Sequence, residues 1–214
     1  MKILFIFSHL DDEAYGPAGT IRKLSEENDV FVMSLCKGDR PGKEEVSETR
    51  KNSFIESCKI LGASPIILEN SDCNLEYRKT LSDIEDIVFS LKPDSVYTNN
   101  ISDIHRDHRI VAETSLVACR PKVGSSVKEF YMCEIPSSTD WSFCQIEPVF
   151  TPNKYVNIVD YIEYKIKALS LYQTELYDYP DSRSLKSVEN LAMYRGKQIG
   201  CYYAESFKQV YKFD

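Results

Sequence analysis

Two short stretches of this 214-residue chain carry side chains that could bind a metal ion and hydrolyse a bond. In the first, an apolar run at residues 3–7 is followed at once by His9, Asp11, Asp12 and Glu13. Three carboxylates this close repel one another, and a bound cation offsets that repulsion. Histidine and aspartate together suit zinc, with iron, cobalt and manganese as alternatives. The first stretch therefore predicts a metal site.

The second stretch contains the other two of the chain's three histidines. His105, Asp107 and His108 follow a strand-like run at residues 94–98, so all three histidines come just after predicted strands. In open α/β sheets, sites form beyond the carboxyl ends of the strands. The alternative is a set of surface histidines with acids at a helix N-terminus, where carboxylates are favoured. Two such stretches in a chain with no further histidine favour the metal site.

Apolar runs and amphipathic stretches alternate along the first 119 residues. Short apolar runs predict strands at 3–7, 30–35 and 65–68, and a strand-like run predicts another at 94–98. Longer amphipathic stretches predict helices at 19–28, 44–61, 75–91 and 109–119. The last third is less regular, with strands predicted at 128–133 and within 150–158 and helices at 160–173 and 187–196. The alternation predicts an α/β fold, a Rossmann-like, mostly parallel sheet with helices on both faces.

Composition narrows the class of protein. A chain of this length, 43% hydrophobic and 28% charged, suits one domain spanning residues 1–214. A net charge of −7 argues against a nucleic-acid binder. The first apolar run is too short for a signal peptide, and no run approaches the length of a membrane span, so we expect a cytoplasmic protein. The cysteines form no CxxC pair and are expected to be reduced thiols: Cys36, Cys58, Cys73, Cys119, Cys133, Cys144 and Cys201.

The two histidine stretches resemble the PIG-L/LmbE family of metal-dependent N-deacetylases. The first motif of that family usually reads His-Pro-Asp-Asp-Glu, and here it is His9-Leu10-Asp11-Asp12-Glu13, followed by the turn Gly16-Pro17-Ala18-Gly19. The second, His-x-Asp-His, appears as His105-Arg106-Asp107-His108. Weaker matches are Arg50 before Leu61-Gly62, Lys167 with Tyr172-Gln173, and Arg195-Gly196 before Ala204-Glu205-Ser206-Phe207. The resemblance spans nearly the whole chain. Leu10 replaces the usual proline, and Ser53 replaces the glutamate usually found three residues after Arg50.

The resemblance implies an LmbE-like domain and a role for each motif residue. It implies that His9, Asp12 and His108 hold Zn²⁺, with Fe²⁺ or another divalent metal as the alternative. It matches Asp11 to the general base and His105 to a cation beside the developing oxyanion. It matches Arg50 to an arginine that contacts the substrate; the alternative is a helix surface residue. Asp107 is interpreted as a carboxylate that orients a histidine or as a helix N-cap.

The implied reaction removes the acetyl group from an N-acetylated amino sugar or N-acetylglucosamine conjugate, releasing acetate and a free amine. One alternative is a metal-dependent amidase on a non-sugar acyl amide or a thiol conjugate. Another is a non-catalytic sugar- or nucleotide-binding module, which the intact Asp11 and His105 argue against. The expected partner is a small N-acetyl sugar or conjugate, and the sequence leaves a homo-oligomer open. A tyrosine-rich loop at 175–181 is interpreted either as part of a sugar site or as packing.

Overall fold

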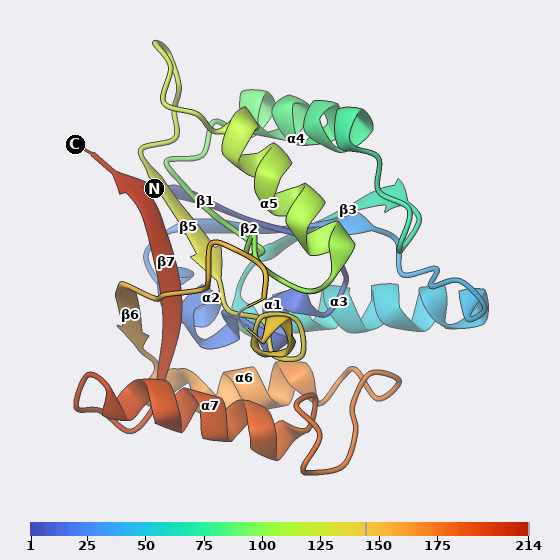
Figure 1. Ribbon diagram of the computed structural model, residues 1–214, viewed down its shortest axis with the longest axis vertical. Coiled ribbons are helices and arrows are strands. Elements are labelled where there is room, and N and C mark those ends of the chain that lie inside the picture. The colour runs from blue at the N-terminus through green and yellow to red at the C-terminus, as the bar shows by residue number, and fades with distance from the viewer. Residues whose placement is uncertain (144, 214) are drawn as a thin grey trace.

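In the computed structural model, which describes residues 1–143 and 145–213, a mixed β-sheet separates two layers of helices (Figure 1). The strands are β1 (Lys2–Phe7), β2 (Asp29–Cys36), β3 (Ser64–Asn70), β4 (Ser95–Thr98), β5 (Glu129–Cys133), β6 (Lys154–Asn157) and β7 (Ala204–Lys212). Their order across the sheet is β3-β2-β1-β4-β5-β7-β6. The first five run parallel, and β7 pairs antiparallel with β5 and β6. The predicted α/β fold with a mostly parallel sheet is confirmed.

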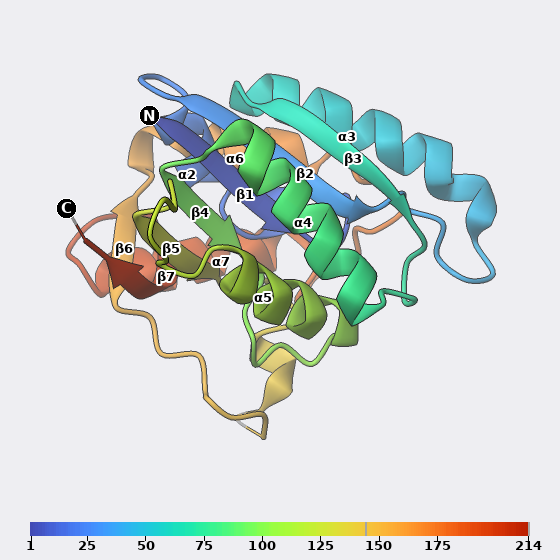
Figure 2. The same ribbon diagram turned by 90° about the horizontal axis from the view of Figure 1, so that it is seen from above.

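The helices cover both faces of this sheet. They are α1 (Asp12–Tyr15), α2 (Ala18–Leu24), α3 (Ser47–Leu61), α4 (Tyr77–Leu91), α5 (Arg106–Ala118), α6 (Ile162–Leu169) and α7 (Leu185–Lys197). Short 3-10 turns occur at Glu44–Val46, Asp140–Ser142 and Val159–Tyr161. Figure 2 shows α4 and α5 lying over one face, while α1, α2, α3 and α6 cover the other and α7 lies beside α6 in Figure 1. The crossovers that parallel strands require supply these two layers.

The central strand β1 is apolar from Ile3 to Phe7 because both of its faces are buried. Leu4 and Ile6 contribute to the core under α4 and α5, and Phe5 and Phe7 contribute to the opposite core. The ring of Phe5 stacks on Tyr97 of β4 with centroids 4.6 Å apart. A strand buried on both faces reads as a continuous apolar run rather than an alternating one, so the run was a reliable strand signal.

Several predicted helices differ from the structure at their ends, as the one predicted at 19–28 does by ending at Leu24, and one strand was not predicted. The second-motif helix begins at Arg106 rather than at residue 109, since His105 is its N-cap. The helix predicted at 160–173 is shorter, Ile162–Leu169, because a 3-10 turn precedes it. Strand β7 was not predicted at all. Its register against β5 shifts at a bulge beside Phe130 and Tyr131, and a bulge disrupts the two-residue alternation of a strand.

The connectivity brings the two histidine motifs together. From β1 the chain builds β2 and β3 on one side, then returns through β4 to pair with β1 on the other side. The loops after β1 and β4 therefore leave neighbouring carboxyl ends, the switch point at which open α/β sheets form their sites.

None of the helices in the described part of the chain is long and apolar enough to cross a membrane. Within the same residues the cysteines Cys36, Cys58, Cys73, Cys119, Cys133 and Cys201 are free thiols, as expected. Cys144 lies outside the described residues.

Candidate active site

The loops after β1 and β4 are joined by the buried amide of Asn99. The Ser8 backbone N–H donates to Asn99 Oδ1 at 2.9 Å, and Asn99 Nδ2 donates to Asp12 Oδ2 at 3.0 Å. Asn99 thereby fixes the orientation of the Asp12 carboxylate relative to both loops. The sequence analysis did not single out Asn99; its one signal is an amide side chain immediately after a buried strand.

His9, Asp12 and His108 converge at this point, and all three are buried. His9 Nδ1 lies 3.2 Å from His108 Nε2, and the Asp12 carboxylate lies 3.3 Å from His108 Nε2 and 3.8 Å from His9 Nδ1. Burial favours a raised pKa for Asp12, but His108 and His9 lower it well below its usual range. Burial opposes the charged form of His108, yet Asp12 and Asp103 raise its pKa to about 10. Two nitrogens and a carboxylate facing one another form a ligand set suited to a divalent metal.

In both His9 and His108, one ring nitrogen faces the other ligand candidates and is called the inner nitrogen. The other, outer nitrogen contacts a carboxylate. Asp103 Oδ2 lies 2.8 Å from His108 Nδ1, and Asp107 Oδ2 lies 3.3 Å from His9 Nε2. Such pairs fix the tautomer and leave the inner nitrogen as an acceptor or ligand. Asp107 was expected either to orient a histidine or to cap a helix. Its carboxylate contacts His9, and the N-cap of α5 is His105 instead. Asp103 was not singled out; it lies five residues before His108, in the irregular start of the motif.

His105 lies beside this cluster at the N-terminus of α5. Its Nδ1 accepts a hydrogen bond from the Asp107 backbone N–H at 3.2 Å, which places the ring proton on Nε2. Burial and the neighbouring imidazoles of His9 and His108 lower the pKa of His105 to about 4. The expected cation is therefore replaced by a neutral N–H donor. Ring nitrogens of the three histidines lie within 4.8 Å of one another, so His105 is a second candidate for the third ligand.

The carboxylate of Asp11 is held by two arginines. Arg183 donates to Asp11 Oδ2, and Arg50 Nη2 lies 3.8 Å from Asp11 Oδ1. Burial by itself raises the pKa of Asp11, but Arg183 and Arg50 outweigh it and lower the pKa. Asp11 is thus held ionised beside the ligand cluster, in the state that a general base requires.

Arg50 is itself enclosed by carboxylates. Its side chain is 2% exposed, with Nη1 2.7 Å from Asp72 Oδ2 and Nε 3.6 Å from Glu175 Oε1. Arg50 lines the cavity and forms ion pairs with these two carboxylates and with Asp11. Its hydrogen bonds to Asp72 and to the Gly38 carbonyl both come from Nη1, however, and among the described residues its Nε has no hydrogen-bond partner. The carboxylates come from distant segments, and Ser53 on the same helix instead donates to the Leu171 carbonyl. The structure gives Arg50 a role in holding Asp11, and leaves its predicted contact with substrate as a hypothesis.

Arg183 and Glu175 are site residues that the sequence analysis missed. Arg183 lies over the ring of Tyr15 at 4.1 Å, and Glu175 forms ion pairs with Arg40 at 3.0 Å and with Arg183 at 3.7 Å. Glu175 begins the tyrosine-rich loop at 175–181, and Arg183 lies in the irregular segment just after that loop. Charged residues in such segments carry no periodic pattern that predicts a partner. Of that loop, Glu175 and Tyr177 line the cavity.

Glu13, the third acid of the first motif, points away from the histidines. Its Oε1 accepts hydrogen bonds from Ser57 of α3, at 2.7 Å, and from Tyr172. Burial raises the pKa of Glu13 to about 8. The side chain anchors α1 to α3 and to the segment after α6, so it supports the motif from behind.

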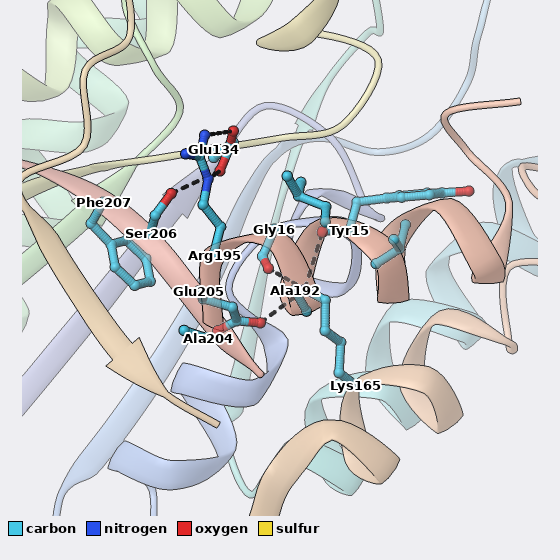
Figure 3. Close-up of a pocket in the computed structure, with 12 residues that line it drawn as sticks. Tyr15, Gly16, Glu134, Lys165, Ala192, Arg195, Ala204, Glu205, Ser206 and Phe207 are labelled. Carbon is cyan, nitrogen blue, oxygen red and sulfur yellow. Dashed lines mark hydrogen bonds and ion pairs between the residues drawn. The ribbon is translucent and has the colours of Figure 1, made fainter. Parts of the chain in front are cut away.

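Lys165 and Glu205 support the other end of the first motif (Figure 3). Lys165 Nζ donates to the backbone carbonyls of Tyr15 and Gly16 and lies 2.8 Å from Glu205 Oε1. The Glu205 carboxylate also accepts from the backbone N–H groups that begin α2. This buried ion pair borders a cavity of about 20 Å³, room for about one water molecule. It fixes the turn between α1, which carries Asp12, and α2.

A cavity of about 280 Å³ opens over the histidine cluster. Besides the motif residues, its walls include Arg40, Arg50, Ser137, Trp141, Tyr177 and Arg183. Its lining combines ionised groups at the base with aromatic side chains. A mostly parallel sheet with two imidazoles and a carboxylate at such a cavity is typical of metal-dependent hydrolases on an α/β scaffold.

Comparison with known proteins identifies the family. Residues 4–119 match the PIG-L family model, described as GlcNAc-PI de-N-acetylase, and the chain belongs to this family. The chain is 25% identical over 224 residues to the diacetylchitobiose deacetylase of Thermococcus kodakarensis, covering 98% of this chain and 83% of that protein.

Solved structures share the fold. The N,N'-diacetylchitobiose deacetylase from Pyrococcus horikoshii superposes with a TM-score of 0.78 at 24% identity, covering 98% of this chain and 83% of that one. The 4-carboxy-2-hydroxymuconate hydratase from Pseudomonas putida superposes with a TM-score of 0.81 at 17% identity, covering 100% and 97%. A hydratase shares the fold, so the fold by itself does not determine the reaction.

Proposed function

We propose that this protein is a metal-dependent hydrolase that removes the acetyl group from an N-acetylated amino sugar. The observation that carries the proposal is the convergence of His9 Nδ1, His108 Nε2 and the Asp12 carboxylate within 3.8 Å of one another. Membership in a family described by de-N-acetylation supports the reaction. Similarity to a diacetylchitobiose deacetylase over nearly the whole chain supports an amino-sugar substrate.

His9, Asp12 and His108 would hold the metal, and we propose Zn²⁺, with Fe²⁺ or another divalent ion as the alternative. The donor set fits, because catalytic zinc sites use three protein ligands of nitrogen and oxygen type. Asp103 and Asp107 hold the outer nitrogens and so aim the inner ones at a common point. When bound, such an ion polarises the amide carbonyl and lowers the pKa of a water molecule.

The remaining motif residues would move the proton and stabilise charge. Asp11, held ionised by Arg183 and Arg50, takes a proton from the attacking water. At the same time the oxygen of that water bonds to the carbonyl carbon of the acetyl group. His105 donates its Nε2–H to the oxygen that becomes negative in the tetrahedral intermediate. As the carbon–nitrogen bond breaks, the proton on Asp11 passes to the amine nitrogen. The products are acetate and a free amino sugar.

The cavity suits one sugar ring better than a polymer. Its volume of about 280 Å³ lies just below the roughly 300–1,000 Å³ typical of small-molecule sites. Trp141 and Tyr177 line the cavity and supply aromatic surface against which a pyranose ring can pack, and the charged side chains of the lining suit its hydroxyls. We propose an N-acetylglucosamine unit, free or conjugated, as substrate, and residues 1–214 as one deacetylase domain.

Release of free amine tests this proposal directly. Metal-loaded protein is incubated with N-acetylglucosamine, N,N'-diacetylchitobiose, a non-sugar acetamide and an acylated thiol conjugate, and the new amine is quantified. Amine from the sugars that disappears on chelation and in Asp11→Asn supports the proposal. Amine only from the non-sugar compounds would assign a different amidase. Sugar binding without amine release by metal-loaded protein would assign a binding module.

A further inference from the structure

A second group of atoms that could bind a metal lies at the edge of the cavity, which two of its residues, Cys73 and His105, line. Cys73 Sγ, a ring nitrogen of His105 and a carboxylate oxygen of Asp107 lie within 4.8 Å of one another. This group shares no residue with His9, Asp12 and His108, although its His105 also lies within 4.8 Å of the other two histidines. Cys73 is exposed in the turn between β3 and α4 and lines the cavity, so a dissolved ion can reach it.

The backbone holds these three residues in place. The Cys73 N–H donates to Asp107 Oδ2 at 2.7 Å, and the Asp107 N–H donates to His105 Nδ1 at 3.2 Å. The first bond ties the turn after β3 to the start of α5, and the second sets the plane of the imidazole. An ion would therefore find its ligands already close together rather than having to order a loop.

The donors and local charge favour a dication with an affinity for sulfur. Zinc binds thiolate, imidazole and carboxylate at about 2.0–2.3 Å, so one ion can bridge atoms at these separations after small side-chain rotations. Burial and the carboxylates of Asp107 and Asp72 raise the pKa of the Cys73 thiol. The same negative charges attract a cation. A bound cation in turn lowers the pKa of a thiol that coordinates it. Cys36 also lies near Asp107, but it is fully buried and its group includes His9, which belongs to the first cluster.

We propose that Cys73, His105 and Asp107 form a second, inhibitory metal site that takes Zn²⁺ or another thiophilic dication such as Cd²⁺. The inhibitory part rests on the proposed function. An ion there withdraws His105 from the oxyanion and Asp107 from the outer nitrogen of His9. Turnover should therefore fall as zinc rises above the amount that fills the first site. Binding itself does not depend on which reaction the protein catalyses.

Binding is tested on the holoenzyme, which already carries its first equivalent of metal. Zn²⁺ is titrated in against a chromophoric chelator, for the unaltered chain, Cys73→Ala, and Cys73→Gly, which suits the φ of 62° at this position. Co²⁺ is titrated in parallel, because a thiolate ligand gives a charge-transfer absorption band. Cys201→Ala is the matched control, since Cys201 lies in the turn between α7 and β7 and outside the cavity.

We expect the unaltered chain and Cys201→Ala to bind a further equivalent of Zn²⁺ and to show the Co²⁺–thiolate band. Both Cys73 variants should lose the band and bind that equivalent roughly tenfold or more weakly. No saturable further binding by the unaltered chain, or the same binding in the Cys73 variants, would overturn the site. Circular dichroism of each variant verifies that it is folded.

Activity then tests inhibition separately. Once a substrate is found, the zinc concentration for half-inhibition should rise roughly tenfold or more in Cys73→Ala and stay unchanged in Cys201→Ala. Equal sensitivity of all three proteins would overturn the inhibitory role even where the binding results hold. Because the Co²⁺ band needs no substrate, failure of the proposed deacetylation is distinguished from failure of this site.

Discussion

The ion pair between Lys165 and Glu205 should be one of the most costly single contacts to remove. The two side chains are 3% and 6% exposed, with Nζ 2.8 Å from Oε1. Lys165→Met keeps the length of the side chain but removes its charge and its three hydrogen bonds. The Glu205 carboxylate then stays buried beside two backbone donors, and the carbonyls of Tyr15 and Gly16 lose theirs.

The size of the effect follows from this burial. Removing one partner of a buried pair costs about 3–5 kcal/mol because the other charge is left uncompensated. For a chain of this length, each kcal/mol shifts Tm by roughly 2–4 °C, so Tm should fall by about 6–20 °C. The double variant Lys165→Met with Glu205→Gln should recover part of this loss, since it leaves no buried charge. Metal affinity should fall as well, because the released carbonyls end the helix that carries Asp12.

Urea unfolding of the metal-free chain gives the free-energy differences, and a zinc titration gives the change in affinity. Lys167→Met is the matched control, because Lys167 is an exposed lysine on the same helix. This variant should change the free energy of unfolding by less than about 0.5 kcal/mol. A loss below about 1 kcal/mol in Lys165→Met would refute the reasoning. A double variant that is less stable than Lys165→Met would also refute it, because the loss of stability would then not come from an uncompensated charge on Glu205.

The remaining predictions concern the site. His9→Ala and His108→Ala should each lose bound metal, since each removes a ligand; full metal content in both would remove these residues from the first site. Asp11→Asn should retain metal but slow amide hydrolysis by at least roughly 10²-fold, the lower range for losing a general base; near-normal kcat with full metal would contradict this. His105→Ala should retain the catalytic metal and substrate affinity and lose about 2.7–4 kcal/mol of transition-state stabilisation, the scale of one oxyanion donor; loss of metal would make it a ligand. Arg183→Met should lower kcat/KM roughly 10–100-fold by removing a charge-assisted hydrogen bond to Asp11, with partial rescue by lysine; unchanged kinetics would separate the arginine from catalysis.

Much of the scaffold could be predicted because its signals are local. Residues 3–7 predicted β1, since a strand buried on both faces is continuously apolar. Residues 94–98 predicted β4 through the β-forming residues Val96, Tyr97 and Thr98. Strand β7 was not predicted, because its sequence is neither continuously apolar nor alternating. Two polar residues, Glu205 and Ser206, are adjacent in it, and its register against β5 shifts at a bulge.

The sequence by itself determined which side chains could bind a metal, since the two motifs place histidines and carboxylates a few residues apart directly after buried strands. Only the tertiary structure decided what holds those side chains. Arg183 reaches Asp11 across 172 positions of sequence, and Asn99 reaches Asp12 across 87. A local pattern encodes the face of a strand or helix, because neighbours in sequence share one backbone conformation. The partner of a loop charge depends instead on which strand ends the sheet brings together, and that is set by the connectivity of the whole fold.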